Sequence, residues 1–218
     1  MEKFAEVGCL KLWQGILLFF VGSFLIALLY ADEILLTAAV ILVGIATLAI
    51  DKWKNVKHFF VAMAVGGTCE NLAVALGGWS YANAGFLFTP LWLPIGWGLS
   101  VVVMDELLGK RLKVNFTWVA LGLAFAGAAF ASLLAPDEGL LLAAFSAVTL
   151  LLFRSGFYKK QEIAGGVVAA IMGTAMETIS ILAGNWEYTA AVFLTPIWLP
   201  LCWFNAFLIM RRVMRAFD

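Results

Sequence analysis

The sequence has little of what metal, redox or phosphate chemistry requires. It contains one histidine, His58, and three cysteines among 218 residues. A lone histidine excludes haem ligation by a histidine pair and a histidine-rich di-iron site. The cysteines show neither disulfide nor metal-ligand spacing, and no phosphate-binding glycine loop or Gly-x-Ser-x-Gly turn occurs. We therefore expect neither a metal nor a cofactor.

Charge is scarce too. Charged residues make up 13% of the chain and their formal sum is zero, so no basic tract favours a nucleic-acid partner. Hydrophobic residues instead reach 64%, with a mean hydropathy of +0.99, whereas soluble domains hold roughly 45–50% apolar residues. The composition predicts a polytopic integral membrane protein whose function lies in or beside the bilayer.

Apolar runs of the length that crosses a bilayer, about 17–25 residues, divide the chain into eight predicted helices. Helices are expected because they satisfy every backbone hydrogen bond within the spanning segment. The predicted fold is therefore all-α. The runs lie near residues 12–30, 34–50, 59–78, 86–104, 116–135, 139–153, 164–184 and 193–210.

The basic residues indicate the orientation of these helices. All 14 lysines and arginines fall on one side of the eight-span arrangement, and the opposite loops carry only acids. By the positive-inside rule, both termini are expected to be cytoplasmic. We expect the protein in a bacterial or archaeal inner membrane.

One motif occurs twice. Residues 66–97 read GGTCENLAVALGGWSYANAGFLFTPLWLPIGW, and residues 173–203 read GTAMETISILAGNWEYTAAVFLTPIWLPLCW. Each copy has a glutamate, a glycine seven residues later, Trp-x-Tyr, Thr-Pro-x-Trp-Leu-Pro and a final tryptophan. The repeated pattern predicts a duplication that places one carboxylate per copy within an apolar stretch.

The duplication extends beyond the motif, because the acid pair at 32–33 matches the pair at 137–138. We therefore predict two four-helix repeats, residues 1–112 and 113–218. Four spans per copy give both copies the same orientation, which implies a pseudo-two-fold axis along the membrane normal. The two motifs are then expected to face each other or to face equivalent grooves.

Glu70 and Glu177 are the candidate catalytic residues. They are the only ionisable side chains well inside the predicted spans, where a charge costs about 2.5–3.5 kcal/mol on insertion scales. A protonated carboxyl beside an ionised one is a common arrangement for acid/base catalysis. The alternative is that each acid only bonds a backbone group, Asn71 or Thr178, and so holds helices together.

The motif aromatics are candidate substrate-binding residues, together with Asn71. Trp97 and Trp203 are placed deepest, where indole faces stabilise a cation. For the Trp-x-Tyr pairs, the favoured interpretation is an ordinary aromatic belt at the membrane interface, with the glutamates about 13 Å below it at ~1.5 Å per residue, and substrate binding is the alternative. The candidate set is Trp79, Tyr81, Trp92, Trp97, Trp186, Tyr188, Trp198 and Trp203.

Two local features of the motifs predict structure. The Thr89-Pro90 and Thr195-Pro196 pairs resemble an N-cap followed by proline in the first helical position. The next prolines, Pro94 and Pro200, would then remove a hydrogen bond and kink each helix near its start. Small residues at the start of each motif are expected to let neighbouring backbones approach closely.

The motifs resemble those of a known family. Tandem copies with an intramembrane acid followed by Gly-x-Trp-x-Tyr and proline are similar to the integral-membrane lycopene cyclase domain and, more loosely, to membrane carotenoid hydratases. The resemblance covers mainly residues 70–97 and 177–203. It implies proton-initiated cyclisation of a polyene by carboxylates, without a redox cofactor. The acidic pair that this family carries after the proline is absent, since Leu-Trp-Leu follows Pro90 and Ile-Trp-Leu follows Pro196.

Three functions are compatible with these features. The first is an intramembrane enzyme that acts on an isoprenoid (terpenoid or carotenoid) or other lipid, with cyclase- or hydratase-like acid/base chemistry. The second is a small proton-coupled transporter or lipid flippase. The third is a membrane subunit that binds pigments or partner helices through its tryptophans. The sequence leaves the oligomeric state open.

Overall fold

The computed structural model describes residues 9–50, 52–85, 87–108, 137–154, 156, 160–189, 191 and 193–214. The predicted helix at 116–135 and the predicted repeat boundary at 112/113 lie outside these residues. The described elements are α1 (Cys9–Leu29), α2 (Glu33–Ile50), α3 (Val56–Ala75), β1 (Trp79–Tyr81), α4 (Leu93–Leu108), α6 (Glu138–Arg154), α7 (Lys160–Leu182), β2 (Trp186–Tyr188) and α8 (Leu199–Met214).

The helices have the length and surface of membrane spans. Three segments are long and apolar enough to cross a bilayer, Glu33–Ile50, Val56–Ala75 and Glu162–Leu182. Shorter apolar segments occur in α1, α4 and α8. Large apolar side chains also lie exposed along the outer faces, among them Phe24 and Leu150, as expected where lipid replaces water. The prediction of a helical integral membrane protein is confirmed.

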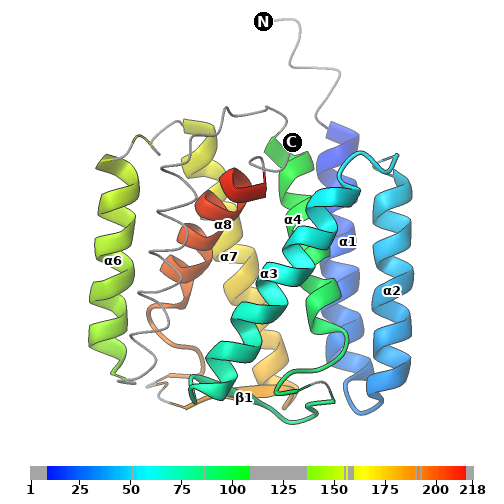
Figure 1. The fold of residues 1–218 in the computed structure, drawn as a ribbon, viewed down its shortest axis with the longest axis horizontal. Coiled ribbons are helices and arrows are strands. Elements are labelled where there is room, and N and C mark those ends of the chain that lie inside the picture. Colours follow the sequence, from blue (N-terminus) through cyan, green and yellow to red (C-terminus); the bar gives the residue numbers. More distant parts are fainter. Residues whose placement is uncertain are drawn as a thin grey trace, which may run out of the picture.

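The elements form a bundle, and we call the end that carries β1 and β2 its closed end (Figure 1). Helix α3 packs most extensively on α4, and α7 packs most extensively on α8. The short strands β1 and β2 lie together at one end of the bundle, and the described beginning of α1 and end of α8 lie at the other. The two motif regions, more than a hundred residues apart in sequence, thus meet at the same end.

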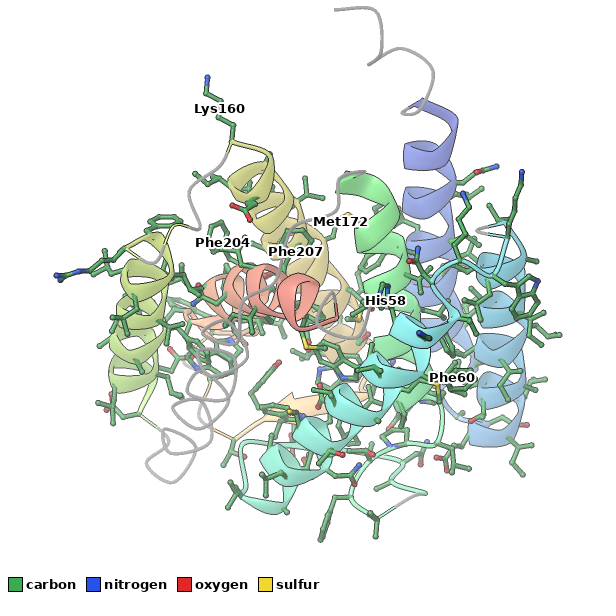
Figure 2. The ribbon with its side chains drawn as sticks, turned by 45° about the horizontal axis from the view of Figure 1, so that its top comes forward. His58, Phe60, Lys160, Met172, Phe204 and Phe207 are labelled. Atoms are coloured by element: carbon green, nitrogen blue, oxygen red, sulfur yellow. The ribbon has the colours of Figure 1, made fainter. Side chains whose placement is uncertain are left out.

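Helix α8 is held in place by its aromatic face. Phe204 and Phe207 are buried with Leu152 of α6 and Ala169 of α7, and Figure 2 labels both on α8. Asn205 is fully buried, and its amide donates to the carbonyl of Phe145 at 2.9 Å while its oxygen accepts from the Thr149 hydroxyl at 3.0 Å. These bonds tie α8 to α6 in the buried interior.

Helices α4 and α8 begin later than predicted. They start at Leu93 and Leu199, three residues after the prolines that were expected to open them, and a turn occupies the intervening residues. Pro94 and Pro200 therefore lie in the first helical turn, where an N–H has no intrahelical acceptor and its loss costs little. The prediction that these prolines interrupt a helix was wrong.

The acid pairs between helices have structural roles. Asp32 and Asp137 each accept the backbone N–H three residues later, at 2.9 and 2.8 Å, and so cap α2 and α6. The Glu33 carboxylate accepts the N–H of Leu91 at 2.7 Å. It thereby fastens the Thr-Pro loop of the first motif to the start of α2.

The fold is not purely helical. Strands β1 and β2 pair antiparallel, with Trp79 opposite Tyr188, Ser80 opposite Glu187 and Tyr81 opposite Trp186. Each strand therefore meets the equivalent strand of the other motif in reversed order. The all-α prediction missed this ribbon because three residues are too few to show strand periodicity, and their partners are distant in sequence.

Candidate functional site

The carboxylate of Glu70 lies within a cage of hydrogen-bond donors. Its Oε2 accepts the indole N–H of Trp79 at 3.1 Å and the hydroxyl of Tyr81 at 3.0 Å. Its Oε1 accepts the indole N–H of Trp97 at 3.2 Å. Both oxygens are thus engaged, by donors from β1 and α4. Indole nitrogens only donate, so this cage suits an acceptor.

Glu177 occupies an equivalent cage. Its Oε2 accepts the indole N–H of Trp186 at 2.8 Å and the hydroxyl of Tyr188 at 3.1 Å. Trp203 takes the place of Trp97 beside the carboxyl, but its indole nitrogen has no hydrogen-bond partner of standard geometry among the described residues. The Oε1 of Glu177 is therefore held less firmly than the Oε1 of Glu70.

Chain reversals after α3 and α7 bring the Trp-x-Tyr segments back onto the carboxylates. Gly77 and Gly184 have φ angles of 80° and 79°, a conformation that glycine adopts without a Cβ penalty. The indoles of Trp79 and Trp186 consequently reach the glutamates directly. The favoured interpretation placed these aromatics some 13 Å above the acids, and that separation was wrong because it assumed that the helix continued.

The two cages are interlocked by their aromatic rings. The Trp79 ring contacts Tyr188, with centroids 5.5 Å apart, and the Tyr81 ring contacts Trp186 at 5.4 Å. Each phenol that bonds one glutamate therefore packs on the indole that bonds the other. The two carboxyls also lie close enough to interact electrostatically. The motifs form one site rather than two separate ones.

Trp97 and Trp203 form the centre of this site. Their rings stack at a centroid distance of 5.6 Å and an interplanar angle of 18°. Glycine makes this possible: a Cβ at position 66 would lie 2.7 Å from the Cβ of Trp97, and one at 173 would lie 2.6 Å from Cε2 of Trp203. These glycines were expected to let neighbouring backbones approach closely. Their missing side chains chiefly leave space for the two indoles.

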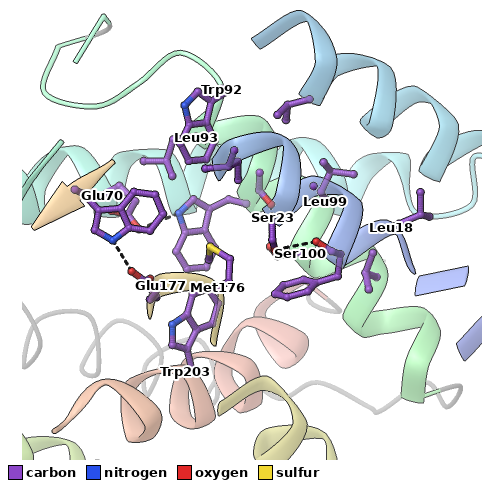
Figure 3. A pocket seen from close by; sticks show the side chains of 18 of the residues that line it. Leu18, Ser23, Glu70, Trp92, Leu93, Leu99, Ser100, Met176, Glu177 and Trp203 are labelled. Carbon is purple, nitrogen blue, oxygen red and sulfur yellow. Dashed lines mark hydrogen bonds between the residues drawn. The ribbon is translucent and has the colours of Figure 1, made fainter. Parts of the chain in front are cut away.

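A cavity of about 80 Å³ adjoins both carboxylates. Figure 3 shows Glu70, Glu177, Met176 and Trp203 gathered at one side of it and Ser23 with Ser100 at the other. Of the candidate residues predicted from sequence, the lining includes Glu70, Glu177, Tyr81, Trp92, Trp97, Trp186 and Trp203.

The remaining candidates have other positions. Trp79 and Tyr188 bond the carboxylates without lining the cavity, and Trp198 packs against Phe145, with centroids 5.4 Å apart. The amide of Asn71 donates to the carbonyl of Gly67 and to the hydroxyl of Thr89, both at 2.9 Å, and its oxygen accepts the N–H of Phe88. Asn71 therefore anchors the Thr-Pro loop and does not line the cavity.

Sequence reasoning missed the wall formed by α1 and α4. Leu18, Phe19, Gly22 and Ser23 of α1 line the cavity, together with Ser100 of α4 and other residues of that helix. Helix α1 carries no motif, and its apolar positions look alike in sequence. Only the packing of α1 on α4 and α7 reveals which of its faces is internal.

The site is electrostatically unusual. No lysine or arginine in the described part of the chain donates to either glutamate, and that part contains no cluster of three or more metal-ligating side chains. Burial raises the pKa of the Tyr81 and Tyr188 phenols well above 10.0, and the neighbouring carboxylates raise it further. The phenols therefore remain donors, and the glutamates are the groups able to exchange a proton.

Comparisons with known proteins assign no family. No family model matches the chain, and no curated protein matches it. Among solved structures, the fold is similar to the crystal structure of a mycobacterial Insig homolog, MvINS from Mycobacterium vanbaalenii, and to that of a cross-linked MvINS trimer. Each similarity has a TM-score of 0.49 and 21% sequence identity and covers 72% of this chain and 92% of the other.

Proposed function

We propose that this protein is an intramembrane enzyme that moves protons on an unsaturated isoprenoid lipid, with Glu70 and Glu177 as the catalytic pair. The observation that carries the proposal is the joint site. Two carboxyls without a cationic partner in the described chain border one apolar cavity, and each is oriented by indole and phenol donors. Such preorganised groups suit acid/base work on a substrate that supplies no charge of its own.

The proposal includes the repeat architecture. Two parallel four-helix repeats, related by a pseudo-two-fold axis along the membrane normal, account for the equivalent cages and for the reversed pairing of β1 with β2. The arrangement includes the fifth predicted span, residues 116–135, and the distribution of the basic residues supports cytoplasmic termini. The site then lies in the outer half of the membrane.

The chemistry requires no oxidant or reductant. The protonated glutamate transfers its proton to one carbon of a double bond, so that its O–H bond breaks, a C–H bond forms and the adjacent carbon becomes cationic. The other glutamate, as carboxylate, then takes a proton from a neighbouring carbon, which restores a double bond after cyclisation or isomerisation. If water adds to the cation instead, the same carboxylate takes the proton of that water, and the product is an alcohol.

The hydrogen-bond pattern indicates which glutamate has which role. Three donors engage both oxygens of Glu70, and hydrogen bonds of this kind favour the ionised form. Within the described part of the chain, only one oxygen of Glu177 has donors of standard geometry, which leaves a position for an acidic proton on the other. We assign Glu177 as the acid and Glu70 as the base. The stacked indoles of Trp97 and Trp203 stabilise the cation between these steps.

The test is lipid conversion in cells. A host that makes carotenoids and other isoprenoids carries the gene in D₂O medium, and its lipid extract is analysed by mass spectrometry. A product that carries one carbon-bound deuterium more than its precursor in the same extract is expected, and it is lost in Glu70→Gln and Glu177→Gln. Glu187→Gln is the matched control, because Glu187 lies exposed on β2 within the same motif. A product that persists in both site variants would refute the proposal.

A transporter is less consistent with the site. Alternating access requires one half of the protein to move against the other, whereas the β1–β2 ribbon and the crossed aromatic contacts join the two motifs. Proton-coupled uptake into proteoliposomes, abolished by the same glutamine variants, would establish transport instead. Retention of an unaltered carotenoid through purification would indicate a pigment-binding subunit.

A further inference from the structure

The cavity beside the glutamates extends inward along α1 and α4. At the closed end of the bundle, the Asn185 amide donates to the carbonyl of Ile26 and Asn83 donates to that of Tyr30. The far lining residues Leu18 and Val103 lie eleven and ten residues from the ends of their helices. At 1.5 Å per residue they are about 16 and 15 Å deeper, near the middle of a hydrocarbon core roughly 30 Å thick.

The inner part of this cavity is lined by apolar groups. Its two serines bond their own helices: Ser23 donates to the carbonyl of Phe19 at 2.9 Å, and Ser100 donates to that of Gly96 at 2.9 Å. The neighbouring wall consists of aliphatic and aromatic side chains. A ligand that extends from the carboxylates to this depth is therefore apolar along α1 and α4.

The cavity is too small for a whole lipid. A cavity needs about 10–15 Å³ of volume for each water molecule it holds. A volume of 80 Å³ therefore accepts roughly six atoms of that size, which is close to the five carbons of one isoprene unit. A longer ligand must leave most of its length outside. Gly22 lines this cavity and has open space beside it, since a Cβ at this position would have no atom within 4 Å.

We infer that the substrate is a linear hydrocarbon chain that enters from the bilayer between α1 and α4, end first, so that its terminal unit reaches Glu70 and Glu177. The absence of a side chain at Gly22 leaves the space that the terminal unit of this chain needs. This inference rests on the proposed function for the reacting groups, but access and binding are tested independently of conversion. A terminal isoprene unit and the end of a straight acyl chain share the required chemistry, and the probes below distinguish them.

The experiment uses the full chain in nanodiscs with two photoreactive probes. One is a linear C30 isoprenoid hydrocarbon with a diazirine at one terminus, and the other is a straight C18 hydrocarbon with the same group. After irradiation, peptide mass spectrometry locates the adducts. The isoprenoid probe, whose reactive group is at its terminus, is expected to label Glu70 or Glu177.

The decisive variant is Gly22→Leu, because Gly22 lines the cavity and a Cβ at this position would meet no atom within 4 Å. Labelling of the glutamates is expected to fall by about tenfold or more, since single methylenes alter pocket occupancy by such factors. Val21→Leu is the matched control, because Val21 is 39% exposed on the outer face of the same helix. Undiminished labelling in Gly22→Leu, or adducts confined to outward-facing residues, would overturn the inference.

The two probes and the conversion assay give distinct outcomes. Labelling by the straight chain alone would support the route and overturn the isoprenoid substrate. Glutamate labelling that depends on Gly22, in a protein that converts no lipid, would support the route and refute the proposed chemistry. Conversion that continues unchanged in Gly22→Leu would refute the route and leave the chemistry standing.

Discussion

Substitution of Gly66 by alanine tests how the site is packed. The new Cβ would lie 2.7 Å from the Cβ of Trp97 and 2.6 Å from its Cδ2. The ring atom can move by side-chain rotation, but the Cβ moves only with the backbone of α4. Either α3 and α4 separate, or the indole leaves Glu70.

Both responses destabilise the protein. Overpacking of a close-packed interior costs typically 1–3 kcal/mol, and loss of a hydrogen bond to a charged group costs about 1.5–3 kcal/mol. Because either response suffices to relieve the clash, we expect Gly66→Ala to lower the free energy of unfolding by about 1–3 kcal/mol. At about 2–4 °C per kcal/mol for a chain of this length, the Tm falls by at least about 2 °C.

A thiol-reactive fluorescent dye measures this unfolding in detergent, because Cys69 and Cys202 are free and half-buried in the folded protein. Gly22→Ala is the control, since its Cβ meets nothing within 4 Å, and it is expected to leave the Tm unchanged or slightly raised. In a Trp97→Leu background, the added Gly66→Ala should cost less than about 0.5 kcal/mol. Equal costs in the two backgrounds would refute the contact with Trp97.

Three further predictions concern the same region and the helix ends. Glu70→Gln should reduce stability more than Glu177→Gln by about 1 kcal/mol, measured by the same dye, because an amide NH₂ must face one of the three donors around Glu70; the reverse order would contradict the cages. Asp32→Ala should cost about 0.5–2 kcal/mol through loss of the α2 cap, and an unchanged Tm would show that the cap contributes nothing. Pro200→Ala should change stability by less than about 1 kcal/mol, because Pro200 lies in the first turn of α8, and a large gain in helicity by circular dichroism would instead indicate a relieved kink.

Much of the fold follows from local sequence. Apolar runs predicted helices α2 and α6 within a residue or so at each end, because a segment in lipid must bond its own backbone. The duplicated motif identified both glutamates and all the indoles and phenols that bond them. These residues were recognisable because an acid in an apolar run is costly and conspicuous.

The starts of α4 and α8 were not recognisable in this way. Thr-Pro reads as a helix start by local preference, yet the Thr89 hydroxyl accepts a bond from Asn71, and Leu91 donates its N–H to Glu33. These partners lie 18 and 58 residues away in sequence. Distant side chains thus hold the loop before α4 in a non-helical conformation and overrule the local signal there.

The sequence by itself determined that this chain is a helical membrane protein and that its two glutamates are its exceptional groups, since both conclusions depend on the cost of polarity in hydrocarbon. Only the tertiary structure decided that the glutamates share one site. The antiparallel pairing of Trp79–Tyr81 with Trp186–Tyr188 and the stacking of Trp97 on Trp203 join residues more than a hundred positions apart. Such contacts depend on how whole helices pack, and no local pattern encodes them.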